Sequence, residues 1–155
     1  MNLLKPFKCI VTALLFTGML LYPAVGSSFC FEEAGKIYNL PPILLMSIAK
    51  QESNFKPDAV NVNKNGSYDY GLMQINSSWA ATLGKDGWAE LADPCANVKV
   101  GAWILRQCIN NYGYGWKAIG CYNSRTPGKN EAYANRIAAL VTRYRMQASA
   151  KDELK

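Results

Sequence analysis

The carboxylate of Glu52 lies near the end of a short apolar segment with a helical pattern. This placement constrains what the rest of the chain can form. Residues 42–54 begin with proline, and Leu45 and Ile48 lie seven and four residues before Glu52. At 3.6 residues per turn these positions share one stripe, the face that a helix turns toward a core. Burying an ionised carboxylate is costly, so such a group usually takes a raised pKa and stays protonated, as a general acid must be. The alternative is that the helix ends before Glu52, whose side chain then points into water.

The residue types present exclude several kinds of chemistry. The 155 residues are enough for one domain with a core, and none of them is histidine. Ser-His-Asp triads, Cys-His dyads and histidine metal sites are therefore excluded, and no serine or threonine has an evident activating base. No Cys-x-x-Cys spacing occurs, which argues against zinc and thiol-redox chemistry. We expect no metal and no cofactor.

Residues 1–27 have the pattern of a secretory signal peptide. Lys5 and Lys8 form a positive start, an apolar run covers residues 10–22, and Ala24 and Gly26 have the spacing of a cleavage site. A transmembrane anchor is the alternative, but the run is shorter than the roughly 20 apolar residues that a span needs. We therefore expect export to the periplasm or out of the cell.

The charge balance is modestly positive. The chain has 17 Lys and Arg against 11 Asp and Glu, a formal charge of +6, and removal of Lys5 and Lys8 with the signal peptide leaves 15 basic residues. This bias favours anionic polymers such as peptidoglycan. The lysines are scattered and the chain is expected to be exported, which argues against nucleic acid as a partner.

Four cysteines remain after the predicted cleavage, an even number that suggests two disulfides in an exported chain. Three pairings are possible, and the sequence alone does not choose among them. We favour Cys30–Cys95, which would join the starts of two helices, and Cys108–Cys121, which would join two successive helices across a Gly-rich turn.

Apolar periodicity and turn residues predict a single, mostly α domain over residues 28–147, followed by a solvated tail over 148–155. The polar stretch 57–70 fits a small hairpin and a wandering loop equally well, because Asn65-Gly66 is a strong turn signal. Helices are predicted over residues 31–40, 42–54, 76–83 (ended by Gly84), 94–112 (capped by Asp93), 116–122 and 130–146. The expected buried positions are Val98, Ala102, Leu105 and Ile109 in the longest helix before residue 112, and Ala134, Ile137, Ala138, Val141 and Tyr144 in the last helix. The predicted class is α+β, mostly α.

A second carboxylate deserves comparison with Glu52. Asp69 follows Glu52 by seventeen residues and stands between two tyrosines. A glycosidase that uses two carboxylates would need such a partner, and lysozyme has the same separation between its two carboxylates. We favour a turn-forming role for Asp69 and keep the two-carboxylate mechanism as the alternative.

Four segments in order carry a resemblance to a known family. Glu52-Ser53, residues 71–75 (Gly-Leu-Met-Gln-Ile), Tyr122-Asn123 and the late Tyr133 resemble the motifs of the soluble lytic transglycosylase (SLT) catalytic domain. The mature chain as a whole is similar to the small single-domain transglycosylases that accompany type III and type IV secretion systems and pili. This resemblance implies a lysozyme-like α+β fold with a small irregular β region after the helix that carries Glu52.

The resemblance also implies roles for single residues. Glu52 would be the sole acid and base: it protonates the oxygen between N-acetylmuramic acid and N-acetylglucosamine, then accepts a proton from the C6 hydroxyl as a 1,6-anhydro ring closes. Tyr133 would face Glu52 across the cleft, and the other implied substrate contacts are Ser53, Met73, Gln74, Tyr122 and Asn123. The implied partners are peptidoglycan strands and components of a secretion or pilus apparatus, and we expect a monomer.

The chain departs from the family pattern after Asn123, where Ser124-Arg125 replaces two small residues, and at Cys121. Arg125 would put a charge near the cleft rim, where it could contact peptide-stem carboxylates; the favoured alternative is a solvated helix end. Three functions remain open at this point: a lytic transglycosylase, a hydrolytic muramidase that uses Glu52 and Asp69, and a non-catalytic wall-binding module for assembly.

Overall fold

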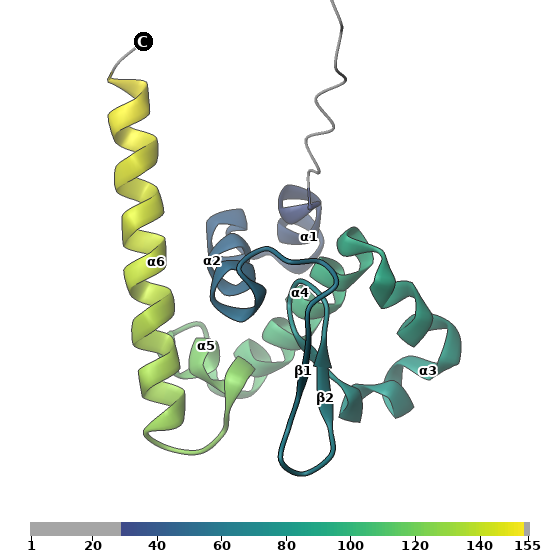
Figure 1. Cartoon of the computed structure of the whole chain (residues 1–155). Helices are drawn as coiled ribbons and strands as arrows, with labels where there is room; N and C mark the ends of the chain where they lie inside the picture. Colours follow the sequence, from purple (N-terminus) through teal and green to yellow (C-terminus); the bar gives the residue numbers. More distant parts are fainter. Residues whose placement is uncertain (1–28, 154–155) are drawn as a thin grey trace, which may run out of the picture.

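The computed structural model describes residues 29–153, so the predicted signal peptide lies outside the described residues. Within this range the chain forms six α-helices, two short 3-10 helices and one three-stranded sheet (Figure 1). The elements are α1 Phe31–Tyr38, α2 Pro42–Ser53, β1 Val60–Val62, β2 Tyr68–Tyr70, β3 Ile75–Asn76, η1 Ser77–Trp79, α3 Ala80–Ala89, η2 Glu90–Ala92, α4 Pro94–Tyr112, α5 Trp116–Asn123 and α6 Lys129–Asp152. The predicted class is confirmed: the fold is mostly α, with a small sheet after the second helix. Among the helices of residues 29–153, none has the length and apolar character needed to cross a membrane.

Helix α2 follows the sequence pattern closely. Pro42 occupies its first turn, where a missing N–H costs nothing. The helix ends at Asn54, which adopts a left-handed conformation (φ 55°) and donates its N–H to the carbonyls of Ala49 and Lys50. The helix therefore still includes Glu52, and its apolar residues pack against α1 and α6.

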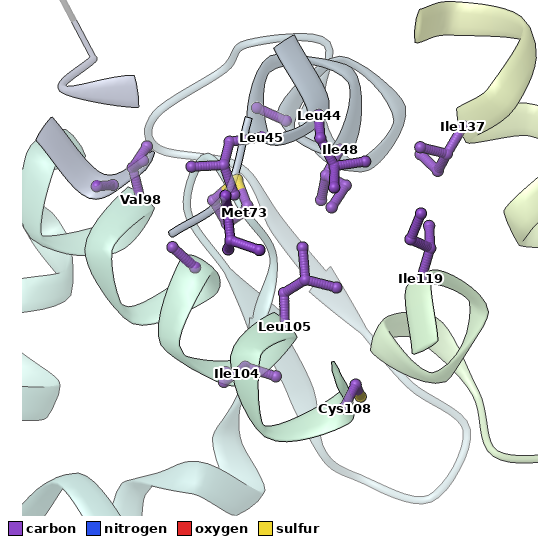
Figure 2. Close-up of a cluster of buried hydrophobic side chains, with 14 of the residues drawn as sticks. Leu44, Leu45, Ile48, Met73, Val98, Ile104, Leu105, Cys108, Ile119 and Ile137 are labelled. Carbon is purple, nitrogen blue, oxygen red and sulfur yellow. The ribbon is translucent and has the colours of Figure 1, made fainter. Parts of the chain in front are cut away.

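The main core lies where α2, α4, α5 and α6 meet (Figure 2). Leu45 and Ile48 of α2 are fully buried, as is Leu105 of α4, and each such side chain contributes roughly 1.5–3 kcal/mol relative to an exposed one. The four positions predicted for α4 (Val98, Ala102, Leu105 and Ile109) are all buried. Asp93 caps this helix as predicted, accepting a hydrogen bond from the N–H of Ala96 at 2.8 Å.

Residues 57–70, for which the sequence fitted a hairpin and a loop equally well, contain a hairpin. Strands β1 and β2 pair antiparallel with Asn61 opposite Asp69, and β3 pairs with the other edge of β2. The turn is closed by the N–H of Asn63, which donates to the carbonyl of Ser67, and Gly66 supplies a positive φ of 84°. In Figure 1 the hairpin points away from the α1–α2 side of the molecule.

Three predicted helix ends were wrong, those of α3, α1 and α6. Gly84 does leave helical geometry (φ 72°, ψ 175°), but a further helical turn resumes after this kink and runs to Ala89. The sequence also suggests a turn between Gly84 and Gly87, but Asp86 lies in this helical turn. In α1 the helix ends at Tyr38, because Asn39 takes a left-handed conformation (φ 49°), and Ile37 is exposed.

Helix α6 extends to Asp152, six residues beyond the predicted end at Met146. Residues 147–152 contain good helix formers and neither proline nor glycine, so nothing interrupts the helix. Their side chains are exposed, and this end of α6 rises beyond the other helices in Figure 1. Of the predicted buried positions, Ala134, Ile137 and Val141 are buried, whereas Ala138 and Tyr144 are only partly so.

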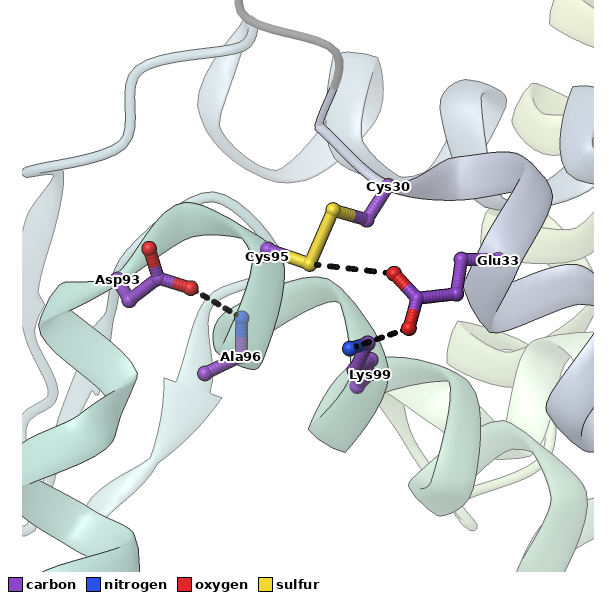
Figure 3. Close-up of polar contacts among 6 residues, drawn as sticks. All are labelled: Cys30, Glu33, Asp93, Cys95, Ala96 and Lys99. Carbon is purple, nitrogen blue, oxygen red and sulfur yellow. Dashed lines mark hydrogen bonds and ion pairs between the residues drawn. A yellow bond between two sulfur atoms is a disulfide. The ribbon is translucent and has the colours of Figure 1, made fainter.

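Both favoured cysteine pairs are joined in the structure. Cys30–Cys95 links the start of α1 to the start of α4, and Cys108–Cys121 links α4 to α5, with Cα–Cα distances of 5.2 and 5.9 Å. Beside the first disulfide, Glu33 forms an ion pair of 2.7 Å with Lys99 (Figure 3). Glu33 and the two sulfurs lie close enough together to resemble a metal-ligand group, but sulfurs joined in a disulfide are not thiolate ligands.

Candidate active site

Glu52 lies in the last turn of α2 and lines a cleft of about 500 Å³. The β1–β2 hairpin forms one side of this cleft, and residues from η1, α4 and α5 form the other. The lining is mostly polar: Glu52, Asn63, Lys64, Asn65, Asp69, Gln74, Ile75, Asn76, Trp79, Ile104, Tyr122 and Asn123. A cleft of this volume and polarity suits a strand of linked sugars better than an apolar ligand.

The surroundings of Glu52 favour its protonated form. Burial raises the pKa of its carboxyl group to about 7, and the negative charge of Asp69 adds to this rise. The hydrogen bond from the Tyr133 hydroxyl, 2.5 Å from Oε1, and the positive charge of Arg136 lower the pKa in part. The carboxyl group can therefore give up a proton near neutral pH and take one back, which a single acid and base must do.

Tyr122 and Tyr133 form the wall behind this carboxyl group. Their rings stack with centroids 6.5 Å apart, and the Tyr122 hydroxyl donates to the carbonyl of Met73 at 2.8 Å. Burial, followed by the negative charge of Glu52, raises the pKa of both phenols well above 10. Both tyrosines are therefore neutral donors at physiological pH, and Tyr133 steadies the orientation of the acid.

Asp69 is not the turn residue that we favoured: it lies in the middle of β2 and lines the same cleft as Glu52. The turn is made by residues 63–67 instead, where Asn65 accepts hydrogen bonds from Ser67. The Asn63 amide donates to one oxygen of Asp69 at 3.0 Å, and the Asn76 amide donates to the other at 2.7 Å. Two amides from different segments thus fix the orientation of this carboxylate.

A buried asparagine holds the segment between β2 and β3, and sequence reasoning missed it. Asn97 of α4 accepts from the N–H of Met73 at 2.8 Å and donates to the carbonyls of Tyr70 and Leu91, both at 3.2 Å. Gly71, with φ 79°, lies so close to Asn97 that a Cβ would overlap the amide. The signal was present, because Asn97 shares a helical face with the buried Gly101 and Ile104, as Glu52 does with its own apolar neighbours.

Three residues with implied substrate contacts do not line the cleft: Tyr133, which is buried and bonds Glu52 instead, Ser53 and Met73. Ser53 is buried, and its hydroxyl donates to the carbonyl of Leu72 at 2.7 Å, with that of Ala49 a further acceptor at 3.2 Å. Met73 is fully buried against Gly101. Both side chains therefore serve packing, and Met73 contributes to the site through its carbonyl, which accepts from Tyr122.

The other implied contacts do lie at the site. Gln74 lines the cleft in a left-handed conformation (φ 50°), and its amide nitrogen donates to the carbonyls of Gly71 and Ala59. Its carbonyl oxygen is the group that it can offer to a ligand. Asn123 is exposed on the cleft wall beside Tyr122. The lining residues Asn63, Asn76, Trp79 and Ile104 were not predicted, because isolated polar and apolar residues carry no local pattern.

A partly buried, protonatable glutamate in a polar cleft that is also lined by a carboxylate on a hairpin is typical of a glycan-cleaving enzyme of the lysozyme-like class. The family model described as "Transglycosylase SLT domain" matches residues 29–139. The chain therefore belongs to the transglycosylase SLT domain family, and it is a peptidoglycan lytic transglycosylase. The family resemblance seen in the four motifs is confirmed.

The chain is also similar to individual known proteins. Protein IpgF of Shigella flexneri is 38% identical over 134 residues, which cover 84% of this chain and 88% of the relative. Invasion protein IagB of Salmonella typhimurium (strain SL1344) is 46% identical over 115 residues, 72% of each chain. Among solved structures, an inactive mutant of lytic transglycosylase Slt from Pseudomonas aeruginosa has a TM-score of 0.62 at 19% identity; the match covers 83% of this chain and 25% of that one. That likeness shows the lysozyme-like fold.

Proposed function

We propose that this enzyme cleaves the β-1,4 bond between N-acetylmuramic acid and N-acetylglucosamine and leaves a 1,6-anhydro end, with Glu52 as the one acid and base. The observation that supports this most is the setting of Glu52: partly buried, with a pKa of about 7, and hydrogen-bonded by Tyr133. A group with this pKa can be protonated before the first step and ionised after it.

In the first step Glu52 donates its proton to the bridging oxygen, and the bond from that oxygen to C1 of the muramic sugar breaks. The N-acetyl oxygen of the same sugar stabilises the positive charge at C1 as an oxazolinium-like species. In the second step the C6 hydroxyl attacks C1, and its proton passes to the Glu52 carboxylate. The C1–O6 bond closes the anhydro ring, Glu52 is again protonated, and no water is consumed.

Residues around Glu52 support these steps in the proposal. Tyr133 keeps its hydroxyl on Oε1, so the other carboxyl oxygen remains available to face the substrate. The hydrogen bond from the Tyr122 hydroxyl to the Met73 carbonyl fixes Tyr122, and its ring gives the cleft a flat surface. Asn123 and the carbonyl oxygen of Gln74 are suited to the N-acetyl groups of the sugars, which need both donors and acceptors.

A hydrolytic muramidase is the second candidate, because Asp69 lines the cleft with Glu52 and is oriented by two amides. In that mechanism Asp69 would stabilise or attack C1, and water would complete the reaction. The non-catalytic module has no comparable support, since a binding protein has no use for an acid with a pKa of about 7 in its cleft.

Product analysis separates the two candidates. Purified peptidoglycan is digested with the mature enzyme, and the muropeptides are weighed by mass spectrometry. We expect products that are lighter by one water than hydrolysis products and that resist borohydride reduction at the anhydro end. Products with a reducible end would refute the transglycosylase chemistry and support the muramidase.

We further propose that the enzyme is exported and opens the wall locally for a secretion or pilus apparatus. The signal-peptide pattern of residues 1–27 supports export to the periplasm, and the similarity to a relative named as an invasion protein supports a role in such an apparatus. Fractionation of cells that carry the full chain, or a chain lacking residues 3–22, tests export. The full chain should appear in the periplasm as a shortened form, and the deleted chain should stay in the cytoplasm.

A further inference from the structure

A second hollow, lined in part by Arg125, adjoins the cleft at Tyr122. This hollow, of about 200 Å³, shares Trp79, Ile104, Tyr122 and Asn123 with the cleft that contains Glu52. Because four residues line both spaces, the two form one groove. Arg125 lines the second hollow but not the cleft around Glu52, and it also lines a third hollow of about 510 Å³ beside Trp116.

The loop that carries Arg125 is well anchored. The Asn130 amide of α6 donates to the carbonyls of Ser124 and Lys117, at 3.2 and 3.0 Å, and the Ser124 hydroxyl accepts from the N–H of Thr126 at 3.1 Å. The Cys108–Cys121 disulfide lines the same hollow and ties α5 to α4. The backbone beneath Arg125 is therefore fixed, in spite of its place in a connecting loop (Figure 1).

The guanidinium of Arg125 has no acidic partner among residues 29–153, where the one ion pair joins Glu33 to Lys99. Glu131 lines the third hollow together with Arg125, but it lies beyond ion-pair distance. An exposed arginine in a hollow that adjoins the cleft is thus available to a ligand. Its planar fork of donors matches a carboxylate better than a sugar hydroxyl.

We propose that Arg125 is a substrate-binding residue that recognises a carboxylate on the muramic side chain of the strand in the groove. This inference rests on the proposed function, since it assumes a peptidoglycan strand in the cleft. Two sources offer this chemistry: the free carboxylates of the peptide stem, and the lactyl carboxylate that is exposed when the stem has been removed. Oligomers of N-acetylglucosamine carry neither group.

Binding measurements in an inactive background test the inference separately from catalysis. Every protein carries Glu52→Gln, and titration calorimetry or fluorescence gives the Kd for three oligosaccharides of equal length: stem-bearing, stem-free muramic, and N-acetylglucosamine alone. Arg125→Gln should raise the Kd of at least one muramic ligand roughly two- to fivefold, the range of a solvent-exposed ion pair, and leave that of the neutral oligomer unchanged. A loss with the stem-bearing ligand alone identifies the stem carboxylates, and a loss with the stem-free muramic ligand alone identifies the lactyl carboxylate. A loss with both shows that Arg125 binds either carboxylate.

Two further variants control for net charge and for side-chain packing. Lys129→Gln removes one positive charge four residues away, from an exposed side chain that does not line the groove. It should leave all three Kd values unchanged. Arg125→Lys keeps the charge and should lose less affinity than Arg125→Gln. An equal loss for all three ligands, or no loss for any, would overturn the inference. The proposed reaction would still be judged by its own products.

Discussion

Glu52 and Asp69 line the same cleft, yet they belong to regions with opposite surroundings. Glu52 ends α2 inside the helical body, against the neutral phenol of Tyr133, and burial raises its pKa to about 7. Asp69 lies on the hairpin, where two side-chain amides donate to its oxygens. The apolar region thus builds a proton donor, and the polar region builds a fixed acceptor. This contrast supports the proposed role of Glu52 as the group that carries the proton chemistry.

The largest effect should come from removing the acid itself. Glu52→Gln keeps the size of the side chain and the acceptor for Tyr133 but cannot donate a proton. Turnover of purified peptidoglycan should fall by roughly 10²–10⁴-fold, the usual contribution of general acid–base catalysis. The control is Glu90→Gln, an exposed glutamate of η2 outside the cleft, which should keep full activity. If the Glu52→Gln variant turned over peptidoglycan at the wild-type rate, a group other than Glu52 would have to donate the proton.

The second prediction concerns Asn97, which connects the helical body to the segment after β2. Asn97→Ala removes one acceptor and two donors and leaves the N–H of Met73 and the carbonyls of Tyr70 and Leu91 buried without partners. The free energy of unfolding should fall by about 2–4 kcal/mol, measured by urea denaturation. Asn110→Ala, on an exposed position of the same helix, should change it by less than about 0.5 kcal/mol. Equal free energies of unfolding for Asn97→Ala and Asn110→Ala would show that Asn97 does not stabilise the segment between β2 and β3.

A third prediction follows from the raised pKa of Glu52. Its pKa lies higher in the folded protein, about 7, than the ordinary 4.5, so the folded state binds the proton more tightly than the unfolded state. The stabilisation is complete below pH 4.5 and is lost as pH rises through 7. Between pH 5 and pH 8 wild type should therefore lose on the order of 2 kcal/mol relative to Glu52→Gln.

Urea denaturation of both proteins at the two pH values measures this difference. Glu90→Gln provides the matched exposed variant and should follow wild type at both pH values. Parallel pH dependence in wild type and Glu52→Gln would mean that burial does not raise the pKa of Glu52.

The helical region could be predicted from the sequence more fully than the hairpin region. Helix periodicity placed α2, α4 and the acid, because apolar residues at positions such as Leu45 and Ile48 report a buried face directly. The orientation of Asp69 depends on Asn63 and Asn76, which meet it only once the sheet has formed. No local pattern encodes such a meeting, so Asp69 was assigned to a turn. Ser53 and Met73 show the converse. The Leu72 carbonyl that accepts from Ser53, and the packing of Met73 against Gly101, are invisible in the sequence and keep both side chains out of the cleft.

The smallest effect, and the one that separates the two candidate reactions, should come from Asp69→Asn. The negative charge of Asp69 raises the pKa of Glu52, so its removal should lower that pKa. Activity requires protonated Glu52 and falls on the high-pH side of the profile as this proton is lost. That fall should then occur at lower pH. In a lytic transglycosylase Asp69 supplies only this charge and some stabilisation of the cation at C1, so turnover at the pH optimum should fall by no more than about tenfold.

The pH profile of peptidoglycan turnover measures both the shift and the loss. Asp86→Asn, which removes an exposed acid of α3, should leave the profile unchanged. In a muramidase that depends on both carboxylates, the loss of Asp69 would abolish turnover at every pH. A residual rate with a shifted limb and anhydro products would therefore confine the hairpin carboxylate to an electrostatic role and leave Glu52 as the one group that moves a proton.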